Sequence, residues 1–147
     1  MRSHELLNGQ PVEIFLETTI RQEDQVHQHV FEEMGRIVKV NEQYYLRFEE
    51  RGEEESAASV TIKIHPQGRV TIIRNAEHTT RLTFDKDQKT ITRFATPAGM
   101  LELDVSTTSL ELALKDRPFS GYLEVDYQMV NGGQLLGEYQ MRLRFTT

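Results

Sequence analysis

The chain has 147 residues, no cysteine and a formal net charge of −6 at pH 7. This length predicts one domain, residues 1–147, which buries enough apolar surface to fold without disulfides. The lack of cysteine excludes thiolate zinc sites and cysteine nucleophiles, and the acidic charge disfavours nucleic acid as a partner.

Apolar and polar residues alternate along most of the chain, which is the pattern of β-strands with one buried face. The first segment places Val12, Ile14, Leu16, Thr18 and Ile20 on one side. Further strands are predicted over residues 36–40, 43–49, 59–64, 69–74, 79–84 and 89–95. No long window has the three- and four-residue spacing of an amphipathic helix.

Turn-forming residues separate these segments. They are Asn41-Glu42, His65-Pro66-Gln67-Gly68, Asp85-Lys86-Asp87-Gln88, Thr96-Pro97-Ala98-Gly99 and Asn131-Gly132-Gly133. Glycine and asparagine accept a positive φ, and proline fixes φ, so these are typical hairpin connections. Short links between consecutive strands predict an antiparallel meander of roughly eight to ten strands.

The register of the apolar residues changes within residues 101–114. Leu101, Leu103 and Val105 are odd-numbered, whereas the leucines after the tetrad Ser106-Thr107-Thr108-Ser109 are even-numbered. Because a one-residue slip would turn a continuous strand inside out, we expect a β-bulge or a tight turn here. Such a bend helps a sheet to curl, and a meander without helices must close to bury its apolar face. We therefore predict an all-β, nearly closed antiparallel barrel rather than a flat sandwich.

The last two strands are expected over residues 123–129 and 135–145. Their alternation places Leu135, Gly137 and Tyr139 on the inner side. Gly121 and Gly137 are small residues among larger inward-facing ones, and this favours free volume inside the barrel for a ligand.

Several short motifs follow one another along the chain. They are YLRFEE (45–50), VTIKI (60–64), VTIIRN (70–75), LTF (82–84), TPAGMLEL (96–103) and LEVDY (123–127). In this order, over about Val12 to Phe145, they resemble the YwiB-like family of bacterial proteins, found mainly in Firmicutes and of unassigned function. Arg74, Thr96, Pro97 and Gly99 match positions of that family. The resemblance implies an intracellular, calycin-like (lipocalin-like) antiparallel barrel, and it supplies no catalytic residues.

Arg74 is the first candidate for ligand binding, because it ends an otherwise apolar run. If it points inward it must be paired, either with a bound carboxylate or phosphate or with one of the many acidic residues. A solvated strand end is the third possibility. Tyr45, Tyr127 and Tyr139 are further candidates, which could orient a polar group of a ligand or simply pack with their hydroxyls satisfied.

Other polar patterns favour structural readings over chemistry. His27 and His29 could be two ligands of a metal, with His65 or His78 as a third, but such a pair is more typical of a half-exposed strand. The pairs Glu102/Asp104 and Glu124/Asp126 alternate with apolar residues, so we expect them on a solvated face. The acidic run 49–55 is expected to be a solvated loop. We predict no catalytic residues, no metal and no cofactor.

The function that these patterns favour is binding without catalysis. The chain is expected to be a cytoplasmic barrel that binds a small, partly apolar ligand in its interior. The alternative is a protein–protein interaction module with a filled barrel. MRSHELLNGQ lacks the apolar segment of a signal peptide, and no run reaches the length of a membrane helix, so no membrane partner is expected. The chain is predicted to be a monomer or a homodimer.

Overall fold

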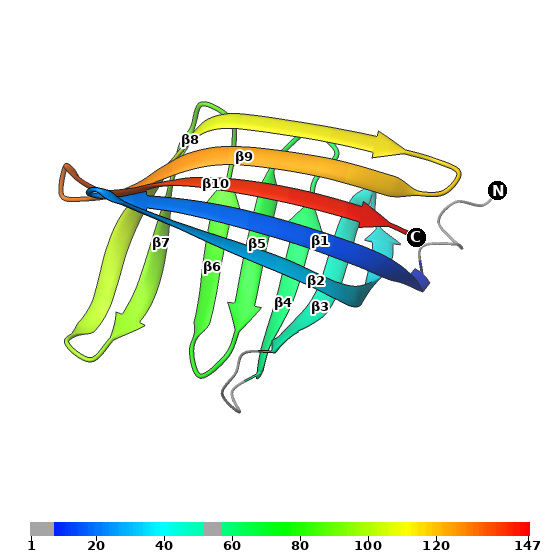
Figure 1. Cartoon of the computed structure of the whole chain (residues 1–147), viewed down its shortest axis with the longest axis horizontal. Helices are drawn as coiled ribbons and strands as arrows, with labels where there is room; N and C mark the ends of the chain where they lie inside the picture. The colour runs from blue at the N-terminus through cyan, green and yellow to red at the C-terminus, as the bar shows by residue number, and fades with distance from the viewer. Residues whose placement is uncertain (1–7, 52–56) are drawn as a thin grey trace.

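The computed structural model describes residues 8–51 and 57–147, where the regular structure is entirely β-strand. Ten strands form one antiparallel sheet (Figure 1). They are β1 (Asn8–Gln22), β2 (Gln25–Val40), β3 (Gln43–Arg51), β4 (Ala57–Ile64), β5 (Val70–Asn75), β6 (Thr79–Phe84), β7 (Lys89–Thr96), β8 (Gly99–Lys115), β9 (Ser120–Asn131) and β10 (Gln134–Thr146). The predicted all-β meander in a nearly closed barrel is confirmed.

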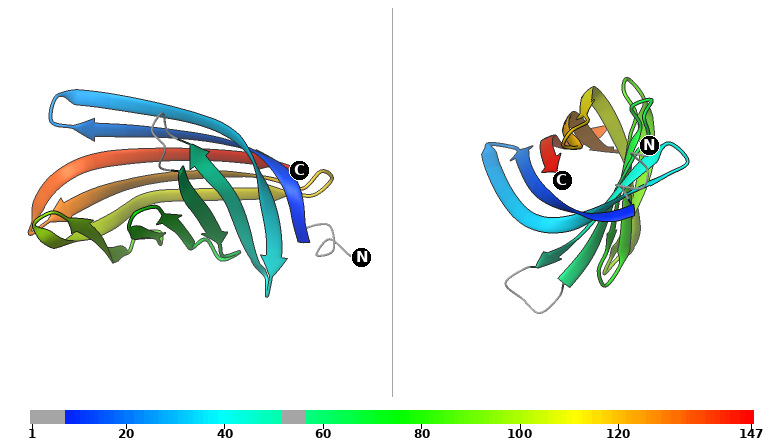
Figure 2. Two further views of the ribbon diagram at one scale, coloured as in Figure 1. Left: turned by 90° about the horizontal axis from the view of Figure 1, so that it is seen from below. Right: turned by 90° about the vertical axis from the view of Figure 1, so that its right-hand side faces the viewer.

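The first and last strands of the chain pair with each other in the middle of the sheet. Its order is β6-β5-β4-β3-β2-β1-β10-β9-β8-β7, and β1 pairs with β10 from Glu13 to Arg21. The long strands β1, β8, β9 and β10 form one wall, and the shorter strands β3–β7 cross below it at a steep angle (Figures 1 and 2). β2 belongs to both walls, because it pairs with β1 along its length and with β3 only over residues 36–40.

Side chains fill the space between the two walls. Phe84 on β6 and Tyr127 on β9 meet across it, with ring centroids 4.5 Å apart. The side chains that are almost completely buried are Val12, Ile14, Ile37, Leu46, Ile62, Ile64, Val70, Phe84, Leu123, Leu143 and Phe145. The predicted inner face of β1 thus supplies two of the most buried residues, as its alternation requires.

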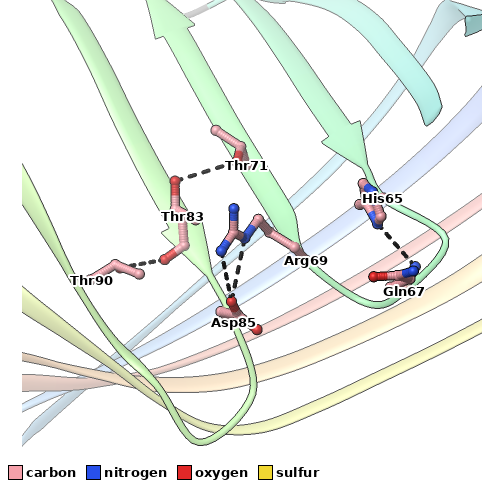
Figure 3. A network of polar contacts seen from close by, with 7 residues as sticks. All are labelled: His65, Gln67, Arg69, Thr71, Thr83, Asp85 and Thr90. Atoms are coloured by element: carbon pink, nitrogen blue, oxygen red, sulfur yellow. Dashed lines mark hydrogen bonds and ion pairs between the residues drawn. The ribbon is translucent and has the colours of Figure 1, made fainter. Parts of the chain in front are cut away.

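Side-chain hydroxyls join β6 to β7, which are the two ends of the sheet order. Thr90 Oγ1 donates a 2.6 Å hydrogen bond to the carbonyl of Thr83, and Thr92 Oγ1 donates one of the same length to the carbonyl of Arg81. Thr83 in turn contacts Thr71 of β5 through the two hydroxyls (Figure 3). We call this junction of β6 and β7 the seam. The threonine hydroxyls replace a backbone ladder there, because they satisfy carbonyls that would otherwise lack partners.

The register change in residues 101–114 is a β-bulge within one continuous strand. Thr107 of β8 pairs with Tyr127 and Ser109 pairs with Asp126, so Thr108 is the extra residue. Its hydroxyl donates to the carbonyl of Asp126 at 3.1 Å. Leu103, Val105 and Leu110 are all buried as a result.

Two expectations for the last strands are wrong. Leu135 is 48% exposed, because a second bulge between Leu135 and Gly137 moves it to the outer side. Gly121 leaves no free volume, because a Cβ added to it would lie 2.2 Å from the ring of Phe145. That ring already occupies the space that the missing side chain would have provided.

The seam generates a test of stability. Replacing Thr92 with valine keeps the shape of this buried side chain but removes its hydroxyl, which leaves the carbonyl of Arg81 without its partner. We expect Thr92→Val to lower the free energy of unfolding by about 1–2 kcal/mol, measured by urea denaturation. Thr61→Val, on the outer face of β4, is the control and should change it by less than about 0.5 kcal/mol. A Thr92→Val protein as stable as wild type would show that the seam hydroxyls are dispensable.

Candidate binding site at the open side of the barrel

One side of the barrel is left open by the divergence of β2 from β3. Within the described residues, 25–35 of β2 pair with β1 alone, and pairing with β3 begins only at Arg36. The left view of Figure 2 looks onto this side, with β2 along one margin and β5–β7 along the other. The inner face of the long wall is therefore uncovered next to β2.

Five apolar side chains on the inner faces of the two walls are only half-buried. Leu16 is paired with Phe31 across β1 and β2, and Ile72 is paired with Leu82 across β5 and β6. Phe94 of β7 has the same intermediate burial, and all of these residues pack against the buried core. Each of these residues therefore keeps part of its apolar surface exposed.

Arg74 lies on the same strand as Ile72. It follows Ile72 by two residues on β5, so both side chains project from the same face. Its guanidinium is 3.3 Å from the carboxylate of Glu50, and the two side chains are 49% and 40% exposed. Of the alternatives weighed from the sequence, the structure thus shows pairing with an acidic residue of the chain itself.

The three candidate tyrosines occupy different environments. Tyr127 and Tyr139 stack side by side on the inner face, with ring centroids 4.9 Å apart. Tyr127 is buried between Tyr139 and Phe84, and this burial raises the pKa of its hydroxyl well above 10. Tyr139 is half-buried and its hydroxyl lies 3.5 Å from the side-chain amide of Gln22. Tyr45 projects from the outer face next to Lys63, so it does not join the other two.

The remaining polar candidates do not converge. His27 and His29 project from the inner side of β2, but in the part of the chain that is described no three potential metal ligands form a cluster. Glu102 pairs with Arg93, and Glu124 with Arg142, on the outer face. Residues 52–56 of the predicted acidic loop lie outside the described residues.

Two features of the site had no clear signal in the sequence. The half-buried inner residues Phe31 and Phe94 belong to segments whose alternation is interrupted by polar side chains. Strand length gave no signal for the divergence of β2 from β3, because β3 continues to Arg51 although its pairing with β2 ends at Arg47. An unusually long segment without a turn signal, between Asp24 and Asn41, is the hint that could have pointed to it.

The burial of Tyr127 predicts how stability depends on pH. Its folded-state pKa is raised above the ordinary value of 10.0, so above pH 10 the unfolded chain releases a proton that the folded chain retains. Stability should therefore fall with rising pH, by up to about 1.4 kcal/mol per pH unit from this residue. In urea denaturation between pH 9 and 11, Tyr127→Phe should show a correspondingly smaller loss. Equal losses in both proteins would mean that the hydroxyl reaches water in the folded state.

Comparisons with known proteins agree with the fold. A crystal structure of the ywiB protein from Bacillus subtilis superposes with a TM-score of 0.77 at 20% sequence identity, covering 92% of this chain and 90% of that one. No curated protein matches by sequence. The described part of the chain has no helix that could cross a membrane. The model of a domain of unknown function, DUF1934, matches residues 14–143. The chain therefore belongs to the DUF1934 family.

Proposed function

We propose that this protein is a non-catalytic binding protein, which holds a small, partly apolar ligand on the inner face of the barrel at its open side. The observation that carries the proposal is the half-buried apolar surface of Leu16, Phe31, Ile72, Leu82 and Phe94. Covering such a surface releases water from it, at about 25 cal/mol per Å² of apolar area.

The location differs from the centre of the barrel, which the sequence favoured. The central side chains already fill that space, as the contact between Phe84 and Tyr127 illustrates. A ligand placed there would have to displace packed side chains, which is costly. The open side needs no such displacement, and of the two inner-face tyrosines Tyr139 is the one that is only half-buried.

Arg74 gives the proposed ligand an orientation. Its ion pair with Glu50 is half-exposed, and such pairs contribute little to stability. A ligand carboxylate or phosphate can therefore replace Glu50 at small cost and accept two hydrogen bonds from the guanidinium. We propose that the polar end of the ligand is anionic and lies at Arg74, with its apolar body over Ile72 and Leu82.

The test uses 1-anilinonaphthalene-8-sulfonate, an apolar anion whose fluorescence rises when it leaves water. Arg74→Met should weaken its binding by about tenfold, because one charge-assisted contact is lost. Arg69→Met is the matched control: Arg69 lies just before the same strand, is paired with Asp85 at 3.1 Å and is 63% exposed (Figure 3). This variant should bind the dye as wild type does.

The apolar half of the site is tested with a second pair on one strand. Phe94→Ser removes a half-buried ring from the inner face of β7, whereas Ile91→Ser removes a side chain of the outer face that is 60% exposed. Only Phe94→Ser should reduce the dye fluorescence. Urea denaturation of both variants separates lost binding from lost folding. If all four variants bind the dye equally, the open side is not the binding site.

A further inference from the structure

The free edge of β2 is an unusual surface for a protein strand. Residues 25–35 contain no proline and no lysine, which are the residues that commonly protect sheet edges. Val26, Val30 and Met34 project from its outer face and are 60%, 57% and 54% exposed. An edge of this length with exposed apolar side chains is a template for pairing with another strand.

Two tight turns define which backbone groups the edge presents. Gln22 pairs with Gln25, and Val40 pairs with Gln43, each across a two-residue turn. Residues that flank such a turn exchange hydrogen bonds, so odd-numbered residues of β2 bond toward β1 and even-numbered ones away from it. The amide and carbonyl groups of Val26, Gln28, Val30, Glu32 and Met34 therefore point out of the free edge.

We propose that the free edge of β2 binds the same edge of a second copy of this chain, in antiparallel orientation about a two-fold axis at Val30. This is the register that pairs the whole free segment, because its midpoint is residue 30 and β3 occupies the edge from Arg36 onward. Five residues on each strand would exchange about ten backbone hydrogen bonds. The sheets of the two barrels would become continuous.

The side chains independently select the same register. On the outer face it places Val26 opposite Met34 of the second copy and Val30 opposite its own counterpart, so apolar residues meet apolar residues. On the inner face it places His27 opposite Glu33, where an imidazole N–H can donate to the carboxylate. Shifting the register by two residues instead places Glu32 opposite Val26 or Val30.

The proposed pairing of the two β2 strands ends next to a hollow in the chain. In this register the turn residue Asp24 of the second copy lies opposite Arg36, where β3 diverges from β2. The chain has a hollow of about 610 Å³ at that point, whose lining includes Arg36 and Arg47 together with Glu33 and Glu49. The acidic turn thus lies opposite Arg36, while the two arginines and two glutamates of the lining balance in charge.

A disulfide tests the axis, because the natural chain has no cysteine. Val30→Cys places two thiols on opposed residues, whose Cα atoms in a hydrogen-bonded pair are about 5.5 Å apart, within the range for a disulfide. Val26→Cys is equally exposed, but its counterpart lies about 27 Å away along the strands. Under mild oxidation Val30→Cys should cross-link at least about ten times faster than Val26→Cys. Equal rates would overturn the register.

Sedimentation of the full chain tests the association itself. Wild type should be a dimer at about 50 μM, and Val30→Lys, which opposes two like charges at the axis, should be a monomer. Val40→Lys is the matched control and should remain a dimer, because Val40 is 47% exposed on the same face but lies where β3 already pairs. Glu33→Lys should weaken the dimer and Glu33→Lys with His27→Glu should restore it. A monomeric wild type, or a dimer that Val30→Lys leaves intact, would overturn the proposal.

The dimer does not depend on the proposed ligand. Arg74 lies on β5 and is not part of the β2 edge. Arg74→Met should therefore leave the sedimentation behaviour of the protein unchanged while it weakens dye binding, so the two proposals succeed or fail separately.

Discussion

Pairing of the terminal strands determines the shape of this molecule. A meander of ten strands would be an open sheet with one apolar face in water, unless its two halves were folded onto each other. The ladder between β1 and β10, with Ile14 opposite Phe145 and Ile20 opposite Tyr139, makes the sheet continuous through the termini. Both walls then turn their apolar faces toward each other, and the only break in the described ladder falls between β6 and β7.

β2 connects the structural and functional parts of the protein. One part of this strand joins the two walls, and the other part departs from β3 and leaves both an uncovered inner face and an unpaired edge. A single divergence thus exposes apolar side chains inside and backbone groups at the rim. These two consequences lead to the proposals of a small ligand on the inner face and of a second copy along the backbone edge.

The alternating segments were predictable from the sequence because burial on one face of a strand imposes a period of two residues. The bulge in residues 101–114 was predictable for the same reason, since the leucines change register there. Local pattern did not locate the inner aromatic Phe94 or the seam hydroxyls of Thr90 and Thr92, because their partners lie on strands that meet only when the barrel closes. Leu135 was misplaced, since a bulge at the start of a strand leaves no alternation before it to compare.

Thr108 is the one residue by which β8 departs from strict alternation. A strand without it would run from Thr107 directly to Ser109, and its leucines would still face the interior. The bend of β8 therefore depends on the presence of one extra residue and not on which residue it is. A homologue with a one-residue gap at this point would keep its apolar pattern and have a straighter β8. A gap here in a sequence alignment therefore indicates a strand without the bend.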